Sequence, residues 1–146
     1  MIVLDASVLI GFIFDQDAHH EAALTLLREA ADDSFGVSPV TLAKALVVPT
    51  RLGRVKAAER MLLEIGVTEI PLPRDAAVQL AELRVESGLK MPDCCVLLAA
   101  ITSNGAVATF DSRLANVATA RHIRTLTSES APTGAKNRPS SPPRLR

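Results

Sequence analysis

The sequence is poor in aromatic residues, with four Phe and neither Tyr nor Trp among its 146 residues. Proteins that bind single-stranded nucleic acid on rows of stacked bases depend on such rings, so this class is disfavoured. No single sign of charge dominates either, because 16 acidic side chains balance 16 basic ones. The overall charge therefore gives no indication of a nucleic-acid or membrane partner.

Cysteines are also few, since Cys94 and Cys95 are the only two and are adjacent. This pair rules out a disulfide framework and a zinc site built from thiolates. Both lie in an apolar run, so we expect them to pack in the core. No apolar run approaches the roughly 20 residues of a membrane span, and the first residues lack the basic start of a signal peptide. We therefore expect a cytoplasmic protein with no membrane segment.

The composition divides the chain into a body and a tail. Apolar residues make up 48% of the sequence, enough for one core at this length. We expect residues 1–126 to form a single domain. Residues 127–146 contain four prolines, four basic side chains and one acidic side chain, which predicts a disordered tail with a net charge of +3. Such a tail could touch nucleic acid, although a solvated appendage is the commoner explanation.

Short β-type runs alternate with helical patterns along the body. The predicted strands are Ile2–Leu4, Phe35–Val37, Thr68–Ile70, Ala106–Phe110 and Ile123–Leu126. The predicted helices are Ala18–Ala31, Val40–Val48, Lys56–Ile65, Asp75–Ser87, Asp93–Ser103 and Ser112–Ala120, with a further helical turn after Asp5. This alternation predicts an α/β layer fold with a largely parallel sheet, and it leaves the strand order open.

Three aspartates lie at junctions between these elements. Asp5 follows the first strand, Asp111 follows the fourth, and Asp93 opens a helix. Ligands of parallel sheets bind beyond the carboxyl ends of the strands, where Asp5 and Asp111 are expected. Each Asp could instead simply cap a helix. Carboxylates that converge need a cation between them, and oxygen ligands favour Mg²⁺ or Mn²⁺.

A divalent ion on carboxylates at this edge suggests phosphodiester hydrolysis, because the ion can activate water and neutralise charge on phosphate. The sequence has no glycine-rich phosphate loop, which disfavours kinases, ATPases and dinucleotide enzymes. Phosphoaspartate enzymes would need a second acid beside Asp5, but Ala6 and Ser7 follow it.

Three segments surround these aspartates, namely Met1–Ile10, Leu89–Ala100 and Val107–Leu114. Together, in this order and spacing, they resemble the PIN-domain ribonucleases, and specifically the VapC toxins of bacterial toxin–antitoxin pairs. The resemblance extends from Met1 to about Leu126. It implies a three-layer α/β/α sandwich around a mainly parallel five-stranded sheet. It also implies a Mg²⁺-dependent endoribonuclease that forms a homodimer and is neutralised by a small VapB-like antitoxin.

The resemblance also assigns roles to individual residues. The metal ligands and catalytic acids would be Asp5, Asp93 and Asp111. Ser7 and Thr109 match small hydroxyl positions that orient the carboxylates or a water molecule.

Two positions depart from the family pattern. The family usually has a Glu in the helix after the second strand, where this chain has Lys44, and many relatives have an Asp where it has Arg113. Arg113 or Lys90 could instead steady a phosphate. An ammonium in place of a carboxylate changes the local charge by two units, and unit charges about 4 Å apart interact by about 4 kcal/mol at an effective dielectric constant near 20.

Three interpretations of Lys44 are open. It could point outward and leave a weakened site of three aspartates, it could occupy the site as a built-in cation, or it could be a natural or introduced change that silences a toxic enzyme. The second interpretation gives a catalytically degenerate protein that binds antitoxin or RNA without cleaving. In the absence of metal we expect the Lys44 ammonium within about 5 Å of a carboxylate.

Two further features remain open. His19 and His20 lie near several acids, where a hydrated helix start is a commoner explanation than a metal cluster. The dense apolar run from Leu9 to Phe14 predicts exposed apolar surface for the antitoxin.

Overall fold

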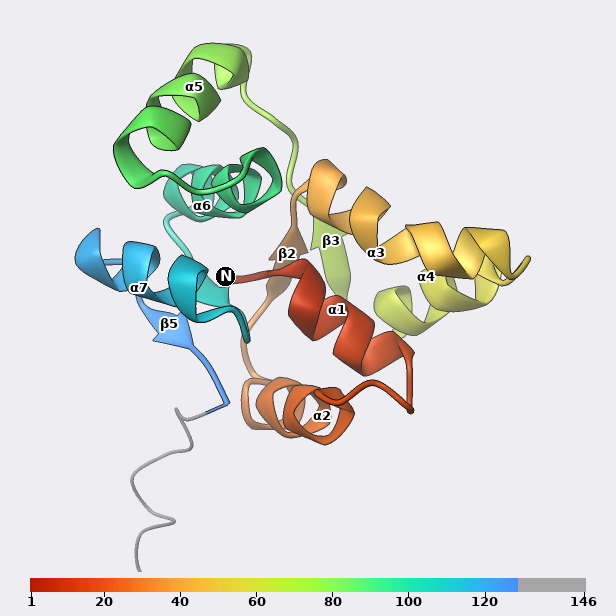
Figure 1. Cartoon of the computed structure of the whole chain (residues 1–146). Helices are drawn as coiled ribbons and strands as arrows, with labels where there is room; N and C mark the ends of the chain where they lie inside the picture. Colours follow the sequence, from red (N-terminus) through yellow and green to blue (C-terminus); the bar gives the residue numbers. More distant parts are fainter. Residues whose placement is uncertain (129–146) are drawn as a thin grey trace, which may run out of the picture.

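Five parallel strands form one sheet in the computed structural model, which describes residues 1–128 (Figure 1). The strands are β1 (Ile2–Leu4), β2 (Phe35–Val37), β3 (Val67–Glu69), β4 (Ala106–Ala108) and β5 (Thr125–Leu126), in the order β3-β2-β1-β4-β5. All four pairings are parallel. The predicted fold class is therefore confirmed, and the sheet is fully rather than mainly parallel.

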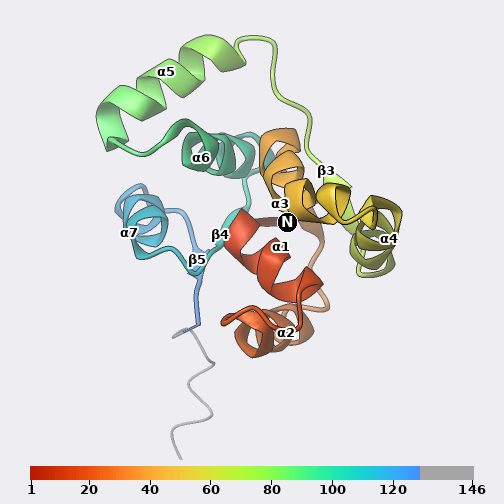
Figure 2. The ribbon, with the colours of Figure 1, turned by 45° about the vertical axis from the view of Figure 1, so that its right-hand side comes forward.

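Seven helices cover the two faces of this sheet within residues 1–128. They are α1 (Ala6–Ile13), α2 (His20–Glu29), α3 (Pro39–Arg51), α4 (Val55–Glu64), α5 (Ala76–Ser87), α6 (Met91–Ser103) and α7 (Ser112–Ala120). Helices α1 to α4 gather on one side of the sheet and α5 to α7 on the other (Figure 2). The three layers expected from the family resemblance are therefore present.

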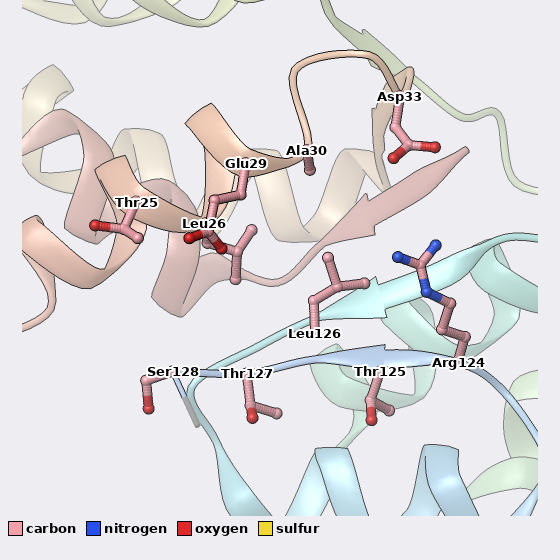
Figure 3. A pocket seen from close by; sticks show the side chains of 10 residues that line it. All are labelled: Thr25, Leu26, Glu29, Ala30, Asp33, Arg124, Thr125, Leu126, Thr127 and Ser128. Atoms are coloured by element: carbon pink, nitrogen blue, oxygen red, sulfur yellow. The ribbon is translucent and has the colours of Figure 1, made fainter. Parts of the chain in front are cut away.

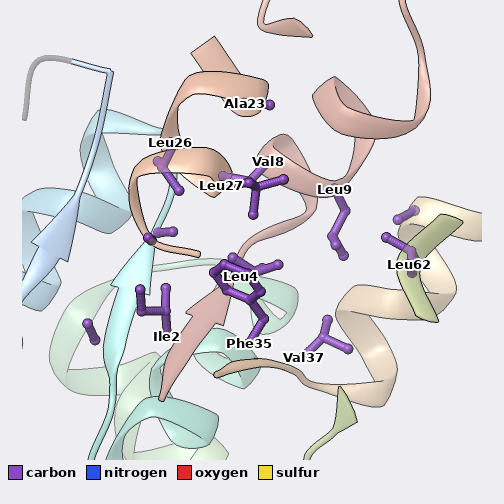
Figure 4. Close-up of a cluster of buried hydrophobic side chains, with 14 residues drawn as sticks. Ile2, Leu4, Val8, Leu9, Ala23, Leu26, Leu27, Phe35, Val37 and Leu62 are labelled. Atoms are coloured by element: carbon purple, nitrogen blue, oxygen red, sulfur yellow. The ribbon is translucent and has the colours of Figure 1, made fainter. Parts of the chain in front are cut away.

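The alternation of side chains along β1 and β4 produces two separate cores. Ile2 and Leu4 point to the side of α1 to α4, whereas Val3 points to the side of α5 to α7. Figure 4 shows Ile2 and Leu4 beneath the apolar faces of the helices on the first side. All three side chains are essentially inaccessible to solvent, as expected for a parallel strand covered on both faces. Cys94 and Cys95 are buried as predicted.

Helix α3 runs three residues beyond its predicted end. Proline usually interrupts a helix because it lacks an N–H, yet α3 continues past Pro49. In the structure Pro49 is buried inside the helix, and the Thr50 hydroxyl donates to the carbonyl oxygen of Leu46 at 2.7 Å. Burial of the proline ring and this extra hydrogen bond offset the one that Pro49 cannot make.

The apolar run after Asp5 is partly buried in the core. It forms α1, which packs against α2 and α3, so that Leu9 is fully buried and Phe12 and Ile13 are half-buried against the core. Ile10 and Phe14 are also only partly buried, so some apolar surface of this run stays exposed, as predicted. The most exposed large apolar side chains lie mainly on other helices, namely α3, α4, α5 and α6.

Two predictions concern regions outside the sandwich. None of the helices described is long and apolar enough to cross a bilayer. The predicted tail, residues 127–146, lies outside the described residues from Glu129 onward.

Candidate active site

The site begins where the two central strands of the sheet end. Strands β1 and β4 are neighbours, with Leu4 opposite Ala108, so Asp5 and Thr109 leave the sheet side by side. The Asp5 N–H donates to the Ala108 carbonyl oxygen at 2.9 Å, which extends the ladder by one residue. Residues more than a hundred positions apart in the sequence therefore meet at one edge.

Asp5 is a buried carboxylate held by two hydroxyl groups. Its side chain is only 6% exposed, and its Oδ2 atom accepts hydrogen bonds from Ser7 Oγ at 2.8 Å and Thr109 Oγ1 at 2.7 Å. Although Asp5 occupies the position before α1, its side chain makes no capping bond to that helix. The simple capping interpretation is therefore wrong for Asp5.

The same two hydroxyls also bind the neighbouring turn. Ser7 Oγ accepts from the Phe110 N–H, and Thr109 Oγ1 accepts from the Asp111 N–H, both at 3.0 Å. Each hydroxyl thus donates to Asp5 and accepts from the backbone that follows β4. The β1–α1 turn and the β4–α7 turn are locked together through these contacts.

Asp111 has a structural role in addition to its position near Asp5. Its Oδ1 atom accepts from the N–H groups of Arg113 at 2.9 Å and Leu114 at 3.3 Å, which caps α7. The capping interpretation is therefore right for Asp111. The Arg113 side chain is exposed and takes part in no ion pair within the described residues.

Asp93 shares an electrostatic neighbourhood with the other two acids. It lies in the first turn of α6 and is half-buried. Burial raises the pKa of its carboxyl group above the ordinary value of 3.8, and the charges of Asp5 and Asp111 raise this pKa further. Lys44 and Lys90 lower the pKa of Asp93 in part. The charges of Asp5 and Asp111 are thus close enough to act on the Asp93 carboxyl group.

Lys44 acts on the charge of the acids without contacting them. Its side chain is exposed on α3, and it makes no ion pair or hydrogen bond with any residue from 1 to 128. Its effect on the pKa of Asp93 nevertheless places it within electrostatic range of the acids. Lys44 therefore acts on them at longer range than a contact.

The carboxylates do not form a closed ligand set. Among residues 1–128 no three His, Cys, Asp or Glu side chains stand together in an arrangement that could hold a metal ion. Carboxylates repel one another unless a cation lies between them, and one oxygen of Asp111 is committed to α7. His19 and His20 form no metal cluster either: the His19 ring stacks on Phe110, and His20 Nδ1 lies 2.7 Å from the Gly11 carbonyl oxygen.

Two buried hydroxyls near the start of α3 were not singled out by sequence reasoning. Ser38 is fully buried and Thr41 is 2% exposed, and neither hydroxyl oxygen has a hydrogen-bond partner in the described part of the chain. An unsatisfied buried polar group costs about 1–3 kcal/mol. Their only sequence signal is that they precede Lys44 in the Ser-x-x-Thr part of the family pattern.

Two hollows lie beside β5, one on each side of it. The first, about 300 Å³, lies between α2 and β5 and contains Glu29, Asp33 and Arg124 but none of the predicted site residues (Figure 3). The second, about 260 Å³, lies between α7 and β5 and includes Thr109 and Asp111 in its wall. Only the second hollow therefore adjoins the acids.

A buried carboxylate with two further acids, at the carboxyl edge of a five-stranded parallel sheet between helical layers, defines a PIN-like α/β protein. The family model of the PIN domain matches residues 2–120, and the chain belongs to the PIN domain family. A search among curated proteins finds no matching sequence.

Solved structures of toxin–antitoxin proteins share this fold. A toxin–antitoxin complex from Klebsiella pneumoniae contains a chain with 22% identity, a TM-score of 0.69, and coverage of 88% of this chain and 98% of that one. VapBC2 from Rickettsia felis, bound to a promoter DNA fragment, gives 15% identity, a TM-score of 0.66 and coverage of 87% and 98%. VapC20 from Mycobacterium tuberculosis, a toxin that cleaves the sarcin–ricin loop, has 19% identity and a TM-score of 0.65. The match covers 80% of this chain and 95% of that one. At these identities the likeness shows the fold.

Proposed function

We propose that this protein is the toxin of a type II toxin–antitoxin pair and hydrolyses RNA phosphodiester bonds with the help of a divalent metal ion. The observation that carries this proposal is the placement of Asp5, Asp93 and Asp111 in one electrostatic neighbourhood of a PIN domain. Solved proteins of the same fold include a toxin that cleaves the sarcin–ricin loop.

The donor chemistry of the site fits Mg²⁺ or Mn²⁺. The three carboxylates would supply hard oxygen ligands, and a cation would relieve the repulsion by Asp5 and Asp111 that adds to burial in raising the pKa of Asp93. When bound, such an ion supplies an activated water and neutralises charge on phosphate. Ser7 and Thr109 hold the Asp5 carboxylate in one orientation through Oδ2. Lys90 and the exposed Arg113 side chain are available to phosphate oxygens.

A small VapB-like antitoxin is the proposed partner. Solved structures with this fold include toxin–antitoxin complexes, and apolar side chains are exposed here on α3, just after it and on α4: Val47, Val48, Leu52 and Leu63. Leu63 is 73% exposed and borders a hollow of about 270 Å³ between α4 and β3. We place the antitoxin on this α3–α4 surface, because patches of this kind mark protein interaction sites.

Lys44 provides the direct test of the proposed activity. In the Lys44→Glu variant the local charge falls by two units, so we expect Mn²⁺ to bind at least about tenfold more tightly and RNA cleavage to increase. Mn²⁺ affinity is measured by calorimetry and cleavage with a labelled RNA, with a chelator as the blank. Asp93→Asn serves as the control that should abolish cleavage in either background.

The presence of Lys44 also favours a second candidate, a catalytically degenerate PIN protein that binds antitoxin or RNA without cleaving. In that case the natural sequence would show no metal-dependent cleavage, whereas Lys44→Glu would restore it. Equal Mn²⁺ affinity and equal cleavage in both proteins would mean that Lys44 does not affect the site. Absence of cleavage in both would contradict the nuclease proposal.

A further inference from the structure

The hollow between α7 and β5 has one wall formed by a single face of α7. Its lining residues on that helix are Ser112, Ala115, Asn116 and Thr119, whose spacing of three and four positions places them on one side. The opposite wall is Thr125, Thr127 and Ser128, and the end nearest the acids is Thr109, Phe110 and Asp111. Thr119 and Thr125 are joined across the hollow by a hydroxyl–hydroxyl contact of 3.3 Å.

The lining is polar but almost uncharged. Seven of its ten residues carry a hydroxyl or an amide, and Asp111 is the one ionisable side chain. A phosphate would meet no cation inside this hollow and would face the Asp111 carboxylate. A neutral group with several hydrogen-bonding atoms fits this lining better.

Phe110 gives the hollow an apolar surface that is held in place. Its ring lies 4.8 Å from the His19 ring, with 21° between the two planes, so the rings are stacked. The backbone of His19 is itself fixed, because its N–H donates to Asp17 Oδ1 and its carbonyl accepts from Ala23 N–H. The Phe110 N–H donates to Ser7, which holds Asp5. The ring therefore has a fixed position relative to the acids.

Asn116 supplies a recognition group. It is exposed on α7, and its side-chain amide makes no hydrogen bond to any other residue that the structure describes. An amide can donate and accept at the same time, which is the pattern needed to read the edge of a nucleobase.

We propose that the α7–β5 hollow is a subsite for one unpaired nucleobase of the RNA, contacted by Phe110 and read by the Asn116 amide, next to the phosphate handled by the acids. Single-stranded RNA is recognised through splayed bases that contact an aromatic ring and hydrogen-bond along their edges. This inference rests on the proposed action on RNA and adds to it the position and the chemical class of a specificity pocket.

The test separates base recognition from cleavage. The full-length protein is titrated in a chelating buffer with short fluorescent homopolymers of adenylate, cytidylate, guanylate and uridylate, and with an abasic strand of equal length. We expect one homopolymer to bind roughly tenfold more tightly than the abasic strand. Asn116→Ala should remove this preference, and Phe110→Leu should weaken it. Gln79→Ala removes an amide on α5 outside the hollow, so it should leave the base preference unchanged.

A nuclear magnetic resonance readout keeps the test independent of affinity changes caused by misfolding. Titration of the natural protein with the preferred nucleoside monophosphate should shift the Asn116 side-chain amide signals, and the Asn104 amide signals should stay in place. Equal binding of homopolymers and abasic strand, with no Asn116 shift, would overturn the subsite and leave RNA cleavage intact. Binding of no RNA, either in the chelating buffer or after Mn²⁺ is restored, would overturn both the subsite and the proposed function.

Discussion

Thr109 serves two partners with one hydroxyl in a fully buried position. It donates to Asp5 and accepts from the Asp111 N–H. Thr109→Val keeps the shape of the side chain but leaves a buried carboxylate without one donor and an N–H without its acceptor. We expect this variant to lose about 2–3 kcal/mol of unfolding free energy.

The matched change Thr109→Ser keeps both hydrogen bonds and removes only a methyl group, at about 1 kcal/mol. Denaturant unfolding of the two variants measures the difference. If Thr109→Val is no less stable than Thr109→Ser, the hydroxyl does not contribute as the geometry indicates.

Asp93 should make folding stability depend on pH. Its pKa is raised in the folded state, so the folded protein binds this proton more tightly than the unfolded chain does. The stability linked to Asp93 is therefore largest below the ordinary value of 3.8 and is lost as the pH rises through the raised pKa. In Asp93→Asn this loss of stability does not occur, because an amide does not ionise.

We therefore expect Asp93→Asn to melt a few degrees higher than the natural protein at neutral pH. The advantage should shrink as the pH falls toward 3.8. Thermal unfolding monitored by circular dichroism across this range provides the measurement. A constant offset at every pH would argue against a role of the charge.

At the residue scale the sequence predicts the positions of the acids better than it predicts their hydrogen-bond partners. Asp5 and Asp111 were placed at the carboxyl edge because each follows a recognisable strand, and both lie there. The separate behaviour of the two carboxylates was not predictable, since both precede a helix yet only Asp111 caps one. The choice depends on which hydroxyls a distant strand brings to Asp5.

At the scale of elements, α7 depends on its cap. Asp111→Ala removes the acceptor for two N–H groups in the first turn, and we expect it to cost about 1 kcal/mol. Asp111→Asn keeps an acceptor oxygen but removes the negative charge. We expect it to lower the unfolding free energy by only about a few tenths of a kcal/mol. Equilibrium unfolding separates the two variants.

The pair of variants also separates capping from metal binding. Asp111→Asn should be nearly as stable as the natural protein, yet it should bind Mn²⁺ more weakly in calorimetry because it lacks the charge. Unchanged Mn²⁺ binding would restrict Asp111 to its capping role.

Strand and helix positions followed from the sequence, but their neighbours in space did not. Short apolar runs marked every strand, although the observed β3 is shifted by one residue and β4 and β5 are each two residues shorter than predicted. The placement of β1 between β2 and β4 depends on long-range pairing that no local pattern contains. The continuation of α3 past Pro49 was likewise not predicted, because the burial of this proline depends on packing.

For the whole molecule, two separate apolar surfaces indicate two different contacts. One lies on α3 and α4, where we place the antitoxin. The other lies on α5, where Val78 and Val85 are 62% and 85% exposed and seven residues apart, on one helix face. We expect this second surface to join two copies of the chain.

Matched substitutions distinguish the two surfaces. Val85→Asp should shift the protein from dimer to monomer in sedimentation experiments and leave antitoxin affinity within about twofold. Leu63→Asp should weaken antitoxin binding by at least about tenfold and leave the dimer unchanged. Leu63 is exposed, so Leu63→Asp should leave the melting temperature of the free protein unchanged, whereas loss of the dimer contact should lower that of Val85→Asp. The opposite pattern would exchange the two assignments.

The bond from Thr109 to Asp5 spans 104 residues, and this has a consequence for synthesis on the ribosome. Asp5 is translated well before Thr109, and its strand lacks one neighbour until β4 has been translated. The acids can assemble only after nearly the whole body has left the exit tunnel, because β4 and the turn after it come late in the chain. A nascent or prematurely terminated chain that stops before Thr109 therefore carries no assembled site.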